Sequence, residues 1–79
     1  MARVLLFGRL SDIAGWRSRD IDSASIDTLR DLLSGEDAAL ADALAAPGVQ
    51  IALDQAIIRG DATLSARSEV AFLPPMSGG

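Results

Sequence analysis

The last eight residues of the chain, FLPPMSGG (Phe72 to Gly79), combine residue types that suit the delivery of a reactive group. Pro74 and Pro75 fix φ and favour an extended exit from the preceding segment. Gly78 and Gly79 have no side chains, so that the backbone alone limits the channel they can enter. The α-carboxylate of Gly79 is ionised at neutral pH. It becomes reactive once ATP converts it to an acyl-adenylate, which can accept an amine, a thiol or a persulfide.

Catalytic side chains are scarce in the rest of the sequence. The chain has no cysteine and no histidine, which excludes a thiol nucleophile, a thiolate metal site, a disulfide and the commonest general base. All seven basic residues are arginines, so the N-terminus is the sole primary amine. We therefore expect no intrinsic catalytic residue, no metal site and no stably bound cofactor.

The composition predicts one small folded domain with little affinity for polyanions. Its 79 residues, 49% of them hydrophobic, are near the lower size limit for an independent core. The net charge is −4 and no basic run occurs, which disfavours binding to nucleic acid or to anionic membranes. No segment approaches the roughly 18 apolar residues of a membrane span, and the N-terminus lacks the features of a signal peptide. We expect a cytoplasmic protein.

A helix is predicted from Ser25 to Ser34 and a second, shorter helix over residues 37–46. Ser25 is a typical N-cap, and Asp27 suits the positive end of the helix dipole. Apolar residues then recur at the spacing of one helical face: Ile26, Leu29, Leu32 and Leu33. Gly35 stands where a C′ glycine would end the first helix.

Strands are predicted from apolar runs on either side of these helices. The runs cover residues 4–7, 49–53, 56–58 and 69–73, and the short polar stretch 17–21 is a possible hairpin arm. Residues 11–16 are expected to form a loop or short turn, and Asp54-Gln55 a tight hairpin turn. This order predicts an α+β fold in which helices cover one face of a mixed sheet.

Side chains alternate between the two faces of a strand, so the open face must carry one of two apolar sets. In the first strand, Val4 and Leu6 share one face, and Leu5 and Phe7 share the other. In the last strand, Val70 and Phe72 oppose Ala71 and Leu73. An exposed apolar set on a small protein usually marks a partner site, although loops covering that face are the alternative. This alternation of side chains does not determine which of the two apolar sets points outward.

Several other residues are better explained as structural than as functional. Trp16 is more easily explained as a cover over the core edge than as a partner contact. Asp54, Asp61 and Glu69 lie in separate predicted turns without metal-ligand spacing, so we expect solvated loop charges. Three arginines are equally well explained as partner contacts and as ordinary surface charge: Arg3, Arg9 and Arg67.

Four stretches together resemble the small subunit of molybdopterin synthase, the MoaD-type sulfur carriers of the ThiS/MoaD family. They are VLLFGRLSDIAG near the start, SIDTLRDLL in the first predicted helix, ALDQAII before a turn, and the ending SEVAFLPPMSGG. The resemblance covers nearly the full chain, and the ending is its specific part. Where the family usually has Asp-Gly-Asp-Glu before the last strand, this chain has ARSE at residues 66–69, which affects a turn and not the chemistry.

The resemblance implies a β-grasp, ubiquitin-like domain over residues 1–73 and a sulfur-carrying tail over residues 74–79. Gly79 would be adenylated and converted to a thiocarboxylate, which donates sulfur to precursor Z in molybdenum cofactor biosynthesis. The preceding residues would form the slender approach: Pro74, Pro75, Met76, Ser77 and Gly78. On this interpretation the chain is not catalytic by itself and is the sulfur-donor subunit of a sulfurtransferase.

The implied partners are the large (MoaE-type) subunit of molybdopterin synthase, in a heterotetramer, and an ATP-using adenylyltransferase of the ubiquitin-activating (MoeB) type. Phe7, Ile57 and Leu73 stand where the family has hydrophobic residues that contact both partners. The resemblance therefore implies that Leu5, Phe7 and Leu73 face outward.

Three other functions fit parts of the sequence. A sister carrier would supply sulfur to thiazole synthesis or to another pathway, although thiazole carriers are typically shorter and lack Phe-Leu-Pro-Pro before the tail. A ubiquitin-like modifier would join its terminus to lysines of target proteins, and the absence of lysine here forbids lysine-linked chains of this protein. A pure binding module would not depend on Gly79.

Overall fold

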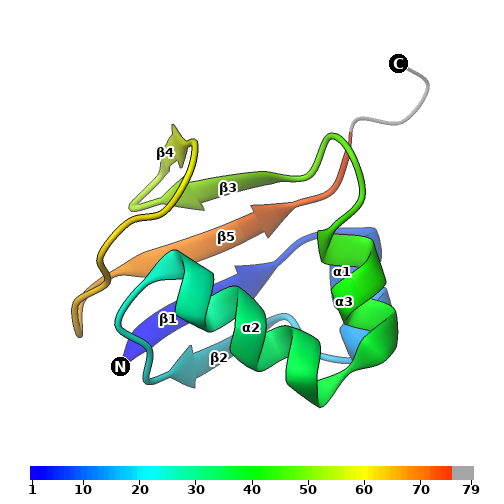
Figure 1. Ribbon diagram of the computed structural model, residues 1–79, viewed down its shortest axis with the longest axis horizontal. Helices are drawn as coiled ribbons and strands as arrows, with labels where there is room; N and C mark the ends of the chain where they lie inside the picture. The colour runs from blue at the N-terminus through cyan, green and yellow to red at the C-terminus, as the bar shows by residue number, and fades with distance from the viewer. Residues whose placement is uncertain (76–79) are drawn as a thin grey trace.

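The chain folds around one mixed β-sheet in the computed structural model, which describes residues 1–75 (Figure 1). Within these residues the strands are β1 (Ala2–Leu6), β2 (Ser18–Ile21), β3 (Gln50–Leu53), β4 (Ala56–Ile58) and β5 (Glu69–Leu73). Their order across the sheet is β2-β1-β5-β3-β4. The central strands β1 and β5 are parallel, and the other neighbours are antiparallel. The predicted strands, including the hairpin arm at residues 17–21, are confirmed to within a residue or two.

The hairpin between β3 and β4 turns at Asp54-Gln55, as predicted. Both residues have positive φ, 50° and 72°, which is the requirement of a type I′ turn. The Asp54 carboxylate also accepts a hydrogen bond from the backbone N–H of Glu69 at 2.9 Å. The turn is thereby tied to the start of β5, so the hairpin adds a well-defined edge to the sheet.

Helix α2 (Ile26–Glu36) lies across one face of the sheet, as the sequence predicts (Figure 1). The Ser25 hydroxyl caps it, since its Oγ accepts a hydrogen bond from the N–H of Thr28 at 3.2 Å. The apolar stripe is buried, with Ile26, Leu29 and Leu33 fully shielded from solvent. Helix α2 therefore supplies the helical half of the core.

The prediction that Gly35 ends this helix is wrong, because α2 continues through Gly35 to Glu36. The chain turns at Asp37 instead, where the backbone N–H still bonds to the carbonyl of Leu33. The Asp37 carboxylate then caps α3 (Ala38–Leu44) by accepting hydrogen bonds from the N–H groups of Ala39 and Leu40. One aspartate thus ends one helix and begins the next, and no glycine is needed between them.

The prediction of a loop over residues 11–16 is also wrong. Helix α1 (Arg9–Ala14) occupies most of that stretch. Leu10 is buried and Ile13 packs against the core, so tertiary burial stabilises a helix too short to be stable alone. Strand β1 consequently ends at Leu6, and Phe7 lies in the link to α1.

The core fills the space between the sheet and the helices. On the sheet side it holds Val4, Leu6, Val70 and Phe72, each at most 3% exposed. All three helices contribute apolar side chains: Leu10, Ile26, Leu29, Leu33, Leu40 and Leu44. The other face of the sheet has no helix over it in the described part of the chain (Figure 1). The predicted α+β fold, with helices on one face of a mixed sheet, is confirmed.

Candidate functional site

The strand register places a row of apolar residues on the open face of the sheet. Leu5 pairs with Ala71, Ala71 with Ala52, and Ala52 with Ile57, so that the row crosses four strands. Alternation places Phe7 and Leu73 on the same face, one step nearer the C-terminal end of β5. We call these six residues the apolar sheet surface: Leu5, Phe7, Ala52, Ile57, Ala71 and Leu73.

The exposure of these side chains agrees with the outward direction that the resemblance implied. Phe7 is 46% and Ile57 is 52% exposed, which is unusual for large hydrophobic residues. Leu5 and Leu73 are half-buried. Leu5 and Phe7 also line a shared recess of about 530 Å³ beside β2. The structure thus brings Phe7, Ile57 and Leu73 to one face, and their partner-binding role stays a prediction.

The sequence prediction did not include Ala52 in this surface, and it named Ala71 only as the residue that shares a strand face with Leu73. Both alanines are nearly buried, at 8% and 9% exposure, because their short side chains lie below their larger neighbours. Together they form a shallow apolar floor between Leu5 and Ile57. The alternation of side chains in the strands at residues 49–53 and 69–73 is the sequence pattern from which this floor could have been predicted.

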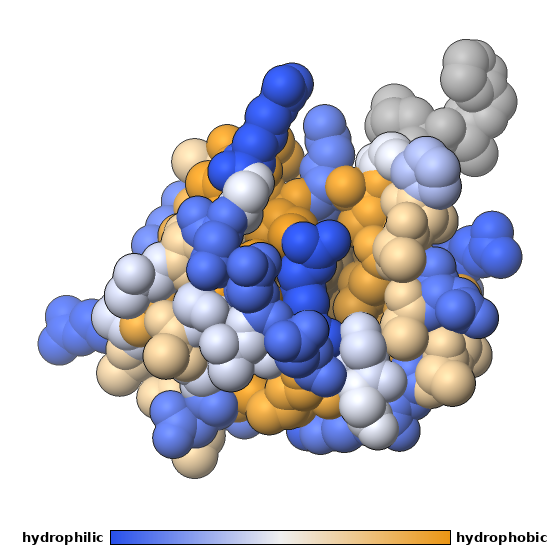
Figure 2. Space-filling model, viewed as in Figure 1, coloured by the Kyte–Doolittle hydropathy of each residue, from blue (hydrophilic) through white to orange (hydrophobic). Residues whose placement is uncertain are grey.

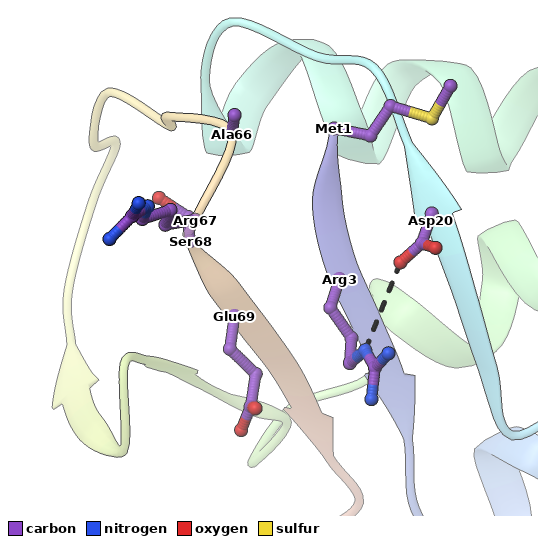
Figure 3. Close-up of a pocket in the computed structure, with 7 residues that line it drawn as sticks. All are labelled: Met1, Arg3, Asp20, Ala66, Arg67, Ser68 and Glu69. Atoms are coloured by element: carbon purple, nitrogen blue, oxygen red, sulfur yellow. Dashed lines mark ion pairs between the residues drawn. The ribbon is translucent and has the colours of Figure 1, made fainter.

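The opposite end of the open face carries charge. Arg3 pairs with Glu69 in the strand register, and its guanidinium lies 3.9 Å from the carboxylate of Asp20. Figure 3 shows these side chains around an open recess of about 560 Å³ that Met1, Ala66, Arg67 and Ser68 also line. The side chains of Arg3 and Asp20 are more than 60% exposed, so their attraction contributes little. This recess lies at the beginning of β5, whereas the tail follows its end.

The tail begins at the apolar end of the same face. Pro74 follows directly after Leu73 and is half-buried, and Pro75 is exposed. The two prolines line a recess of about 380 Å³ together with residues of α1 and α3. The other predicted tail residues, Met76, Ser77, Gly78 and Gly79, lie outside the described residues. The first tail residues therefore leave the domain directly beside its exposed apolar side chains.

The helical side of the molecule has a different surface. Figure 2 shows hydrophilic residues gathered over α2, with hydrophobic residues visible beside the helix. The inner side of α2 packs against the core. Its outer side carries exposed charged residues such as Asp27, Arg30 and Asp31. Of the two faces of the sheet, the open one therefore offers the large exposed apolar side chains.

Two of the acidic residues considered above, Asp54 and Asp61, have structural roles. Asp54 bonds to the backbone at Glu69, and the Asp61 carboxylate accepts hydrogen bonds from the N–H groups of Asp27 and Ala62. Among residues 1–75, no three acidic side chains are grouped closely enough to hold a metal ion. No helix in that part of the chain is long and apolar enough to cross a membrane.

Trp16 covers the edge of the core near β2, where it is half-buried against the hydrophobic cluster. The guanidinium of Arg19 lies 5.0 Å from the centre of its ring, within the range of a cation–π interaction. Arg19 also donates hydrogen bonds to both carboxylate oxygens of Glu36, at 2.8 and 3.3 Å. This hydrogen bond and the attraction between the charges lower the pKa of Glu36 and raise the pKa of Arg19. The arrangement ties the edge strand to the end of α2.

The strand order β2-β1-β5-β3-β4, with a helix across one face, defines a protein of the β-grasp, ubiquitin-like class. The apolar sheet surface lies on the face that the helices leave open, and the tail begins at the edge of that face, where its prolines also contact the recess lined by α1 and α3. The ThiS family model matches residues 4–79, and the chain belongs to the ThiS family. A search of curated proteins finds no match.

Solved structures support the fold over almost the entire chain. The solution structure of small archaeal modifier protein 1 from Methanosarcina acetivorans has a TM-score of 0.87 and 21% identity, covering 99% of this chain and 95% of that one. A crystal structure of SAMP1 from Haloferax volcanii has a TM-score of 0.83 and 24% identity, covering 99% and 98%. A second crystal structure of that H. volcanii protein has a TM-score of 0.78 and 23% identity, covering 95% and 97%.

Proposed function

We propose that this ThiS-family protein is the sulfur carrier subunit of molybdopterin synthase, with Gly79 as the residue that carries sulfur. The observation that supports this most is the position of the apolar sheet surface beside the start of the tail. Phe7 and Leu73 lie at the end of the sheet from which Pro74 leaves. A partner that covers these side chains also receives whatever the tail delivers.

The proposed chemistry takes place at the Gly79 carboxylate. A carboxylate oxygen attacks the α-phosphorus of ATP, pyrophosphate leaves, and an acyl-adenylate forms. A sulfur nucleophile from a persulfide donor then displaces AMP, and reduction of the resulting acyl disulfide by a thiol releases the thiocarboxylate. As the sulfur passes to precursor Z, water hydrolyses the acyl–sulfur bond and supplies the oxygen that restores the carboxylate for another cycle.

The reactive groups for these steps come from the partners in this proposal. An adenylyltransferase of the ubiquitin-activating type supplies the ATP site, and the large synthase subunit supplies the site for the pterin precursor. The chain itself contributes a docking surface and a tail, and its lack of cysteine leaves it without a competing thiol. It therefore acts as a non-catalytic subunit in a heterotetramer with the large subunit.

Intact mass spectrometry of the protein from its own cells tests the carrier role. We expect a population whose mass corresponds to the replacement of one oxygen by one sulfur at the C-terminus. Alkylation of that population should modify one site, because the chain has no other thiol. Failure to find the thiocarboxylate when the adenylyltransferase and the sulfur donor are present would contradict the proposal.

A second assay tests the molybdopterin pathway specifically. Chemically thiocarboxylated protein is mixed with the large synthase subunit and precursor Z, and formation of the dithiolene is followed. Thiazole synthesis, with its own synthase, serves as the comparison reaction. Transfer to the thiazole synthase without transfer to precursor Z would assign the chain to the sister pathway.

Protein modification is the second candidate function. The similar solved structures are named modifier proteins, and an amine in place of sulfur would convert the same acyl-adenylate into an amide. Their identity to this chain is 21 to 24%, so they support the fold, and the choice between functions depends on the product. Mass spectrometry of cellular proteins for lysines that carry the C-terminal Gly-Gly distinguishes the two functions.

A further inference from the structure

Two glycines flank the prolines with which the tail begins. Leu6 pairs with Phe72 in the parallel ladder, so two residues further on Gly8 is beside Pro74. Gln50 pairs with Leu73 in the antiparallel ladder, so Gly48 is beside Pro75. The turn before α1 and the turn after α3 therefore lie on opposite sides of the two prolines.

The contacts at both glycines leave little space for a side chain. A Cβ atom added to Gly8 would lie 3.2 Å from Cγ of Pro74. A Cβ atom added to Gly48 would lie 3.0 Å from Cβ and 3.5 Å from Cγ of Pro75. Carbon atoms attract best at about 3.5–4.0 Å, so either addition would push the proline away.

The backbone at both glycines also requires glycine. Gly8 has φ 53° and ψ −128°, and Gly48 has φ 89°, which are conformations that other residues rarely adopt. The Gly8 carbonyl accepts hydrogen bonds from the N–H and Oγ of Ser11 at 3.1 and 2.8 Å. On the other side, the N–H of Ala46 bonds to the carbonyl of Ala43 in α3 at 3.3 Å, and the N–H of Val49 bonds to the carbonyl of Ala46. Both turns are thus attached to helices that pack on the core.

The prolines cannot be held by the sheet ladder in the ordinary way, because they have no N–H to donate. The N–H of Phe7 bonds to the carbonyl of Phe72 at 3.3 Å, beside the point where the two prolines begin. Beyond this point the direction of the chain depends on the fixed φ of each proline and on what the rings contact. The glycine turns supply contacts on two sides of the rings, in addition to the recess lined by α1 and α3.

We propose that Gly8 and Gly48 are positioning residues that form a guide for the tail, holding Pro74 and Pro75 in one direction as the chain leaves the sheet. The guide matters for sulfur transfer only if the proposed function is correct, since it then aims the tail at the active sites of the partners. A misplacement of about 1 Å at a reacting atom can cost about 100-fold in rate. Partner binding, in contrast, depends on the apolar sheet surface.

Gly48→Ala tests the guide, and Gly60→Ala is its matched control. Gly60 also has a positive φ, 79°, but nothing lies within 4 Å of a Cβ at that position. Both variants place an alanine in a left-handed backbone conformation, which destabilises the fold in each. Only in Gly48→Ala does the new methyl group also contact a proline, Pro75. Any loss specific to Gly48→Ala therefore arises from the contact with Pro75.

The first measurement is structural and does not depend on function. In NMR spectra of the wild type and of Gly60→Ala, we expect nuclear Overhauser contacts between the Gly48 Hα atoms and the ring protons of Pro75. In Gly48→Ala we expect the corresponding contacts to change and the chemical shifts of Pro75 to move. Absence of the contacts in the wild type, or equal spectra of Pro75 in both variants, would overturn the guide.

The second measurement is kinetic, on thiocarboxylated variants with the large synthase subunit. We expect Gly48→Ala to lower kcat at least tenfold. Its Kd for the large subunit should stay within about twofold of the wild-type value. Gly60→Ala should have the kcat and the Kd of the wild type. Pro75→Gly, which leaves the two turns intact, should lower kcat similarly, and adding Gly48→Ala to it should cause no further loss. If Gly48→Ala does not fold, Pro75→Gly carries the test. A normal kcat in Pro75→Gly would overturn the guide.

The two measurements separate failure of the guide from failure of the proposed function. If wild-type protein transfers no sulfur but the Pro75 contacts respond as expected, the guide stands and the sulfur-carrier function fails. If wild-type protein transfers sulfur and Gly48→Ala matches Gly60→Ala in kcat, the guide fails and the function stands.

Discussion

Phe7→Ala removes an aromatic ring that is 46% exposed and lies at the edge of the apolar sheet surface. A phenylalanine has about 200 Å² of surface, so about 90 Å² of Phe7 remains for a partner to cover. At about 25 cal/mol/Å², this area is worth ~2 kcal/mol of binding free energy. Each 1.4 kcal/mol is about a tenfold change in Kd, so we expect Phe7→Ala to weaken binding roughly 30-fold.

Phe72→Ala is the matched control for folding. It makes the same chemical change one strand away, at a residue that is fully buried. Removing a buried phenylalanine costs about 3–5 kcal/mol of stability, including the cavity it leaves. Phe7 buries about half as much surface and leaves no closed cavity, so Phe7→Ala should cost less than half as much.

The assay is isothermal titration of each variant with the large subunit of molybdopterin synthase, together with urea unfolding of each variant alone. Arg3→Ala is the control for binding, because Arg3 lies at the charged end of the same face. We expect it to bind like the wild type. Unchanged affinity of folded Phe7→Ala would refute the docking surface, and a stability loss equal to that of Phe72→Ala would show that Phe7 belongs to the core.

Three further predictions concern the tail, a helix cap and an ion pair. Deleting Gly79 shortens the reach of the tail by about 3.5 Å, so thiocarboxylate formation, measured by intact mass, should be lost. The midpoint of unfolding in urea should be unchanged. Normal formation of the thiocarboxylate would contradict the carrier role. Asp37→Ala removes the carboxylate that accepts hydrogen bonds from two backbone N–H groups of α3, at 3.0 and 3.1 Å. The free energy of unfolding, measured in urea, should therefore fall by about 1 kcal/mol. An unchanged value would show that this cap does not stabilise the helix. The hydrogen bond and charge of Arg19 hold the pKa of Glu36 below its ordinary value of 4.5, so the ion pair stabilises the fold above that pH and the contribution is lost as pH falls through the lowered folded-state pKa. The stability difference between wild type and Glu36→Gln should therefore shrink on acidification, whereas a difference that stays constant from neutral pH to below the folded-state pKa would contradict this assignment.

The sequence determined the elements whose signals are local. The alternation of large apolar residues in the strands at residues 4–7 and 69–73 separates two faces whatever the rest of the chain does. Ser25 caps α2 with its own hydroxyl, and the spacing of Ile26, Leu29 and Leu33 fixes the buried side of that helix. Each of these signals is contained within a few neighbouring residues, which is why they could be predicted.

The tertiary structure decided the features that depend on distant partners. Helix α1 forms because Leu10 and Ile13 have a core to pack against, and its six residues carry too weak a signal alone. Helix α2 passes through Gly35 because the N–H of Asp37 still reaches the Leu33 carbonyl and its side chain can cap a helix that follows at once.

The candidate site divides in the same way. The chemistry at Gly79 was suggested by residue types, whereas Phe7, Ile57 and Leu73 were named as partner contacts through the resemblance to the MoaD-type carriers. Their arrangement on one face depends on the strand order, which sets Leu5 beside Ala71 and Ile57 beyond Ala52. The same pairing brings Gly8 and Gly48, 40 residues apart in the chain, to the two sides of the prolines. The type of each of these residues can be read from the sequence. Which of them lie side by side depends on long-range strand pairing, because the register joins segments that are far apart in the chain and share no sequence signal.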